Sequence, residues 1–163
     1  THATSSAASD VYKRQGLNRL HQFDKVEIVR IENHECSYDA LDKMLNHVKK
    51  LLHSLELPYR ILNLCGGDLG FTSAITYDFE IFSSAQNKWL EVSSVSNFET
   101  FQSIRLKLKY KDINGKNQFA HTLNGSSLAL PRVMAGILEN NQTNDSIKIP
   151  KVLIPYTDFK LIN

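Results

Sequence analysis

The sequence contains few of the residues that mark several large classes of protein. Its two cysteines in 163 residues are too few for a disulfide framework. Seven glycines and four prolines exclude collagen-like and low-complexity chains. No apolar run approaches the ~18–20 residues that a membrane helix requires, so we expect no membrane partner. These absences favour a protein of a reducing, cytoplasmic compartment.

Two common kinds of site are missing as well. The chain has no GxxxxGK[ST] motif, which excludes a P-loop. Cys36 and Cys65 are too far apart to form the close ligand pair typical of zinc sites, and His34 beside Cys36 lacks a second pair. The net charge of +2 neither requires nor excludes a nucleic-acid partner, because a local patch matters more than the sum.

The remaining composition is that of a soluble globular domain, with 42% hydrophobic and 22% charged residues. Residues 1–15, THATSSAASDVYKRQ, are mostly small or polar and show no helical or strand period. We predict that this segment is non-native or disordered. Residues 16–163 are long enough for one domain and carry the fold.

Hydrophobic periodicity predicts an α+β fold, an antiparallel sheet flanked by helices. Apolar residues at spacings of three and four predict a long helix that is capped by Ser37 and stopped by Pro58. A short helix is predicted at 98–103. A second longer helix is predicted at 128–140, and an extended tail follows it. Strands joined mainly by hairpins favour an antiparallel sheet; they are predicted at 22–31, 59–64, 76–82, 89–95, 104–111 and 119–123.

The first of three local patterns precedes and enters the first strand. If residues 16–27 form one continuous strand, Arg19, Phe23, Lys25 and Glu27 share a face. Such a face could hold a charged, ring-bearing ligand. It could equally be an exposed strand of mixed charge.

The second pattern is Glu91-Val92-Ser93-Ser94. Strand alternation places Glu91 and Ser93 on one face, where both offer oxygen ligands suited to Mg²⁺. Glutamate and serine are also common on solvated strands, so the pattern alone does not decide between these interpretations.

The third pattern is a strand-to-helix junction at which Asn124, Ser126 and Arg132 could converge. The alternative is that Ser126 or Ser127 only caps the helix.

Five segments resemble, in order and spacing, the C-terminal part of the seryl-tRNA synthetases, a class II aminoacyl-tRNA synthetase family. They are GLNRLHQFDKVEIV, LPYRILNLCGGDLGF, TYDFEIF, WLEVSSVSNFETFQ and HTLNGSSLALPRVMAGILEN. The first resembles the later half of motif 2 of that class, and the last resembles motif 3. The resemblance implies part of the class II catalytic fold, in agreement with the α+β prediction.

The resemblance also implies a role for each matching residue. Phe23 would stack on the adenine of ATP, Glu27 and Ser126 would contact serine with Asn124 beside them, and Arg132 would bind the γ-phosphate. Glu91 and Ser94 would hold Mg²⁺ and the ATP phosphates within an ATP-binding segment that comprises Glu91, Val92, Ser93 and Ser94. The catalytic residues would be Arg132 and Glu91.

The implied activity is that of a serine–tRNA ligase, with ATP, L-serine, tRNA(Ser) and also tRNA(Sec) as partners and a homodimeric parent protein. The chain departs from the family pattern, because it lacks motif 1 and the Arg-x-Glu that begins motif 2. We therefore expect a fragment that is inactive alone. The alternative is a synthetase-like paralogue that serves as a binding or regulatory module without aminoacylation.

One further prediction concerns the alternating strand at 104–111. It would place Arg105, Lys107, Lys109 and Lys111 in a basic stripe on one sheet face. The stripe is either a solvated face or a contact for the tRNA acceptor end.

Overall fold

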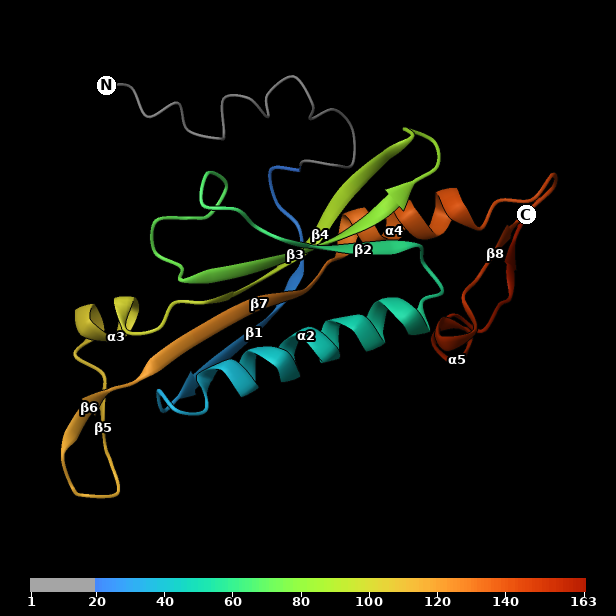
Figure 1. Cartoon of the computed structure of the whole chain (residues 1–163). Coiled ribbons are helices and arrows are strands. Elements are labelled where there is room, and N and C mark those ends of the chain that lie inside the picture. Colours follow the sequence, from blue (N-terminus) through green and yellow to red (C-terminus); the bar gives the residue numbers. More distant parts are fainter. Residues whose placement is uncertain (1–19) are drawn as a thin grey trace.

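The computed structural model describes residues 20–163, which are built around a five-stranded antiparallel sheet (Figure 1). The strand order is β1-β7-β4-β3-β2. Its strands are β1 (Lys25–Glu32), β2 (Tyr59–Asn63), β3 (Ile75–Ser83), β4 (Lys88–Asn97) and β7 (His121–Ala129). The predicted α+β class is confirmed. The prediction for residues 1–15 lies outside the described residues.

Two amphipathic helices, α2 (Ser37–Ser54) and α4 (Leu130–Asn140), pack against the sheet. Their apolar faces and the sheet form one core, as the spacing of three and four predicted. The buried core side chains from these helices and the central strands include Leu41, Met44, Val48, Leu52, Phe79, Ile81, Val95, Leu123, Val133 and Ile137.

The sheet has a second face, opposite α2 and α4, which we call the open face. Phe79, Ile81 and Val95 are fully buried in the core, so the residues that alternate with them point the other way. On β3 these are Asp78 and Glu80. The open face therefore presents polar side chains from the middle of the sheet.

The predicted cap of α2 is wrong. The helix begins at Ser37 with Cys36 at the N-cap position. Ser37 is fully buried, and its hydroxyl lies 2.8 Å from Nδ1 of His121 on β7. Serine is typical of an N-cap, but the Ser37 hydroxyl instead forms a hydrogen bond that connects α2 to the sheet.

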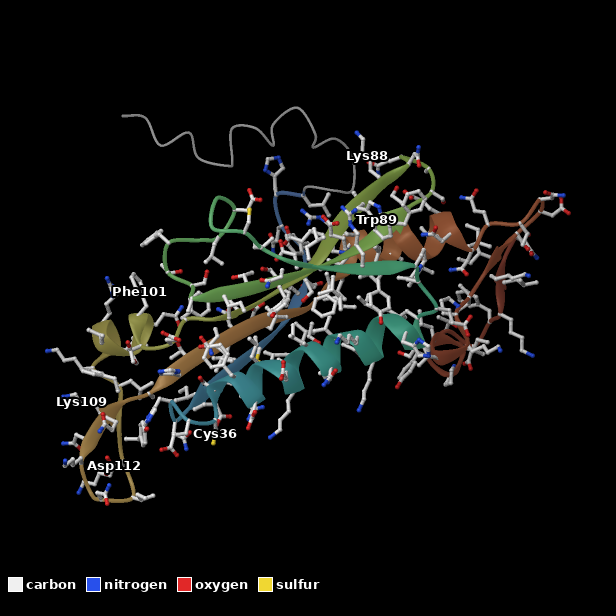
Figure 2. All side chains as sticks on the ribbon, in the orientation of Figure 1. Cys36, Lys88, Trp89, Phe101, Lys109 and Asp112 are labelled. Atoms are coloured by element: carbon white, nitrogen blue, oxygen red, sulfur yellow. The ribbon has the colours of Figure 1, made fainter. Side chains whose placement is uncertain are left out.

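The strand predicted at 104–111 is confirmed only for Lys109–Lys111 and is wrong for residues 104–108. Residues Phe101–Leu106 form helix α3, which ends at Lys107 with a left-handed φ of 55°. A hairpin of β5 (Lys109–Lys111) and β6 (Asn117–Phe119) follows. The basic stripe is therefore divided between a helix and a hairpin, and only Lys109 and Lys111 share a strand face. Figure 2 shows Phe101 and Lys109 at the same end of the molecule.

The predicted extended tail instead forms short elements. They are β8 (Ile147–Lys148), the 3₁₀ helix η3 (Lys151–Leu153), α5 (Ile154–Thr157) and β9 (Leu161–Ile162), with β8 and β9 paired. Pro155 is in the first turn of α5, where its missing N–H costs no helical hydrogen bond. No helix among the described residues is long and apolar enough to cross a membrane.

Candidate active site

The first candidate pattern is only partly a strand. β1 begins at Lys25, so Phe23 lies in the irregular segment before it, with 48% of its surface exposed. The pairing with β7 shifts between Lys25 and Glu27. The predicted continuous strand face is therefore wrong for Phe23, and Arg19 lies outside the described residues. The exposed Phe23 ring remains available for stacking.

Glu27 and Ser126 face each other across β1 and β7. They are partners in the strand register, and the Ser126 hydroxyl donates a hydrogen bond to Glu27 Oε2 at 3.2 Å. Lys25 Nζ lies 2.8 Å from the same oxygen. The carboxylate of Glu27 is therefore oriented from two sides, and it is exposed on the open face.

The third candidate pattern brings Asn124 onto this face as well. Asn124 is two residues from Ser126 on β7, and it pairs in register with Val29 on β1 and Ser96 on β4. The helix-cap alternative for Ser126 is excluded, because β7 continues to Ala129, which is the N-cap residue of α4. The same boundary excludes Ser127 as the cap.

A β-bulge in β4 decides the geometry of the second candidate pattern. Asp78 pairs with Ser94, and Glu80 pairs with Glu91, because the register shifts between Phe79 and Glu80. Cross-strand partners share a face of the sheet. Glu91 and Ser94 therefore lie together on the open face, and the prediction that Glu91 shares a face with Ser93 is wrong.

The bulge also accounts for Val92 and Ser93. Each keeps only 1% of its surface exposed. Ser93 donates a hydrogen bond to the carbonyl oxygen of Ser126 at 2.6 Å, which ties β4 to β7. Their side chains are therefore closed to a ligand, and only the backbone of these two residues could contact ATP.

Arg132 joins the site from the first turn of α4. Its Nη1 donates a hydrogen bond to the carbonyl oxygen of Glu91 at 2.5 Å. The contact connects the start of the helix to the bulged part of β4. Of the predicted convergence of Asn124, Ser126 and Arg132, the first two share a strand face, whereas Arg132 contacts β4.

The open face concentrates negative charge. Partial burial raises the pKa of Glu91, Asp78 raises it further, and Arg132 lowers it. Burial also raises the pKa of Asp78, against which the hydrogen bond from Ser94 acts. Glu80 forms an ion pair with Arg60, whose Nε lies 2.5 Å from Glu80 Oε2. Asp78 and Glu91 thus form the charge-rich part of the face.

This part of the face fits a magnesium ion. Mg²⁺ prefers oxygen ligands and is usually held by one or two carboxylates with phosphates and water. Glu91 and Ser94 supply such oxygens, and Asp78 Oδ1 is a buried oxygen with no hydrogen-bond partner. Within residues 20–163, no group of three or more histidine, cysteine, aspartate or glutamate side chains could hold a metal. The fit therefore requires ligands from a bound phosphate as well.

Sequence reasoning assigned no role to Asp78, although it lies in the quoted segment TYDFEIF. The available signal was an aspartate and a glutamate two residues apart in an otherwise apolar and aromatic strand. Such spacing places both carboxylates on one face. Their position opposite Ser94 and Glu91 depended on the bulge in β4, which strand alternation alone does not predict.

The chain is similar to known proteins of one family. Residues 8–141 match the family model described as the tRNA synthetase class II core domain (G, H, P, S and T). Serine–tRNA ligase of Salinibacter ruber is 55% identical over 159 residues, and that of Chromobacterium violaceum is 54% identical over 153. The matches cover 96% and 93% of this chain, but the chain spans only 36% of each relative.

Solved structures give the same result. The seryl-tRNA synthetase of Pyrococcus horikoshii complexed with ATP matches 96% of this chain and 36% of its own, with a TM-score of 0.89 and 39% identity. The cytoplasmic serine–tRNA ligase of Naegleria fowleri in complex with AMP matches 91% of this chain and 32% of its own, with a TM-score of 0.83 and 32% identity. The family match covers most of the chain, and the antiparallel sheet agrees with it. The chain belongs to the tRNA synthetase class II core domain family.

Proposed function

We propose that the chain is the C-terminal part of the catalytic domain of a serine–tRNA ligase. The supporting observation is the arrangement of the open face, where the Glu27–Ser126 pair and the Glu91–Ser94 pair lie on one sheet. The curated relatives named above, at 54–55% identity, carry the name serine–tRNA ligase. No observation favours the alternative of a regulatory paralogue.

In the first step of the proposed reaction, the serine carboxylate attacks the α-phosphorus of ATP. A new P–O bond forms, the bond to pyrophosphate breaks, and seryl-adenylate results. Glu27 and Ser126 would hold serine, with Asn124 beside them, and Phe23 would stack on the adenine. The protein's contribution is positioning, which can account for a large part of such a rate enhancement.

The phosphates of ATP would lie over β4 and the start of α4. Arg132 would bind the γ-phosphate, and Glu91 and Ser94 would hold Mg²⁺, with backbone contacts from Val92 and Ser93. Bound Mg²⁺ would neutralise phosphate charge. The guanidinium of Arg132 is already connected to β4 through the Glu91 carbonyl, so little reorganisation is needed when charge develops.

In the second step, a terminal ribose hydroxyl of the tRNA attacks the carbonyl carbon of seryl-adenylate, and AMP leaves. We propose tRNA(Ser) as the acceptor, with tRNA(Sec) as a further acceptor. We also propose that the parent protein is a homodimer and works in the cytoplasm, where its substrates are found.

The test uses a chimera in which residues 16–163 replace the matching segment of the Salinibacter ruber ligase, to which this chain is 55% identical. We expect serine-dependent exchange of pyrophosphate into ATP, and charging of tRNA(Ser). A folded chimera without either activity would contradict the proposal, whereas binding of ATP without exchange would favour the regulatory alternative.

The 163-residue chain alone gives a second test. We expect no serine-dependent pyrophosphate exchange from it, because the segment before Gly16, where motif 2 would begin, offers no Arg-x-Glu for the α-phosphate. The loss of one positioned donor typically costs ~10²–10³ in rate. Clear exchange by the isolated chain would show that the site is complete without that arginine.

A further inference from the structure

Asp78 is a half-buried carboxylate of the open face. It lies directly opposite Ser94 in the β3–β4 register, and the Ser94 hydroxyl acts on it as a hydrogen-bond donor that lowers its pKa. Its Oδ1 is buried and has no hydrogen-bond partner among the described residues. Burying a carboxylate oxygen is costly to the folded protein unless the group is paired or hydrogen-bonded.

The hydrogen bond to Asp78 determines what Ser94 can do. A serine hydroxyl has one proton to donate and two lone pairs that accept. A Ser94 proton directed to Asp78 leaves the lone pairs for an electron-poor partner. A hydroxyl fixed in this way is a better ligand for a cation than one that rotates freely, whose proton can face the cation.

The neighbouring carboxylates, Glu80 and Glu91, are not placed to orient the Ser94 hydroxyl. Glu80 is opposite Glu91, and its oxygen is engaged by Arg60 at 2.5 Å. Glu91 faces the proposed ion itself. Among the described carboxylates on this face, Asp78 is the one whose register partner is Ser94.

We propose that Asp78 is a positioning residue of the magnesium site, which orients the Ser94 hydroxyl so that its lone pairs face the ion. The inference rests on the proposed function, since that function places Mg²⁺ at Glu91 and Ser94. Asp78 acts through Ser94 and touches neither ATP nor serine. Partners of this kind behind metal ligands typically contribute 10–100-fold to metal affinity.

The experiment measures Mn²⁺ binding to the chimera in the presence of ATP, by electron paramagnetic resonance of the free ion. We expect Asp78→Ala to raise the dissociation constant of Mn²⁺ about 10-fold or more. Asp78→Asn should lose less, because an amide oxygen can still accept from Ser94. The magnesium concentration for half-maximal pyrophosphate exchange should rise in parallel, while the KM for serine stays unchanged.

A double mutant separates positioning from a general effect on the sheet. If Asp78 acts through Ser94, Asp78→Ala should cost nothing further in a Ser94→Ala background. Thr76→Val is the matched control, because it removes the next cross-strand hydroxyl bond on the same face, the 2.7 Å contact between Thr76 and Ser96. This control should leave the Mn²⁺ affinity unchanged.

The outcomes distinguish the two claims. If the wild-type chimera neither binds Mn²⁺ with ATP nor exchanges pyrophosphate, the proposed function fails and the role of Asp78 fails with it. If the wild-type chimera does both and Asp78→Ala keeps its Mn²⁺ affinity, only the role of Asp78 is overturned. Additive losses in the double mutant, or an equal loss in Thr76→Val, would overturn it too.

Discussion

The Ser126 hydroxyl donates a hydrogen bond to Glu27 Oε2 at 3.2 Å, across the β1–β7 pair. The two residues are 99 positions apart in the chain, yet they face each other on the open face of the sheet. A ligand hydroxyl placed between them could accept from Ser126 and donate to Glu27. It is on this pair that we propose the serine side chain is read.

Substitution of either residue should weaken the choice of serine over alanine. In the chimera, Glu27→Ala or Ser126→Ala should lower kcat/KM for serine and narrow its preference over alanine, because a site that bonds a hydroxyl can reject an analogue lacking it by ~10⁴-fold. Pyrophosphate exchange measured with serine and with alanine gives kcat/KM for each amino acid. The KM for ATP should stay unchanged.

The neighbouring serine provides the control for that experiment. The Ser127 hydroxyl lies 3.4 Å from Nε2 of His47 on α2, away from Glu27. Ser127→Ala should therefore keep wild-type discrimination. If Glu27→Ala and Ser126→Ala also kept it, the serine pocket would have to lie elsewhere.

The hairpin lysines should contribute to tRNA affinity. Lys109 and Lys111 share a face of β5 and are exposed. Lys109 Nζ lies 4.7 Å from the centre of the Phe119 ring, and both charges face solvent, where a phosphate backbone could reach them. Changing both to alanine in the chimera should raise the KM for tRNA and reduce its salt dependence, without affecting the KM for ATP.

Arg105 is more closely tied to its own element than the two lysines are. Its guanidinium stacks 3.6 Å from the centre of the Phe101 ring and donates to the Phe101 carbonyl oxygen, which gives it a role within α3. We expect Arg105→Ala to change tRNA kinetics less than the lysine pair does. Unchanged tRNA kinetics in the lysine variant would leave a solvated face as the explanation.

Buried His121 should make the fold sensitive to acid. Burial lowers the pKa of His121 below its ordinary value of 6.5, with His34 acting in the same direction and Glu99 against it. As the pH falls below 6.5, the unfolded chain takes up a proton that the folded one resists, so stability that is complete above that pH is progressively lost.

The urea midpoint measures this effect in the 163-residue chain. Between about pH 7.5 and about pH 5.5 it should fall, and His121→Asn should reduce the fall, because asparagine can still bond the Ser37 hydroxyl but cannot titrate. An equal fall in the urea midpoint for the wild-type chain and for His121→Asn would mean that other groups cause the acid sensitivity.

Gly125 should not tolerate a methyl group. It pairs with Val95 on β4, and a Cβ added to it would lie 2.8 Å from Val95 Cγ2 and 3.2 Å from Val95 Cα. Val95 is fully buried, so its side chain has little room to move aside. We expect Gly125→Ala to cost about 1–3 kcal/mol of unfolding free energy, the usual cost of overpacking.

Gly67→Ala is the matched control, because a Cβ there meets nothing within 4 Å. Its urea midpoint should remain close to that of the wild-type chain. A Gly125→Ala variant as stable as the Gly67→Ala variant would show that β7 can move away from β4, and that the placement of Ser126 does not depend on this contact.

The sequence by itself determined the α+β class, the two long helices and the family resemblance. Residues such as Leu41, Val48 and Leu52 recur at helical spacing, and this periodicity is local, so it survives without knowledge of the fold. The motif segments likewise carried Glu27 and Ser126 as a pair before any geometry was available.

Local pattern was insufficient where two conformations suit the same residues. Residues 104–107 alternate like a strand, but Phe101 and Ile104 also fit one face of a short helix, and the protein forms α3 there. Ser37 looked like a cap, and its buried bond to His121 could not be foreseen, because the partner is 84 residues away.

The tertiary structure alone decided which oxygens meet on the open face. Strand alternation places Glu91 with Ser93, whereas the bulge places Glu91 with Ser94 and buries Val92. A bulge inserts one residue into the pairing of two strands, so it is a property of the pair and not of either strand's sequence. The physical reason is register: Asp78 gained its place opposite Ser94 only when β3 and β4 came together.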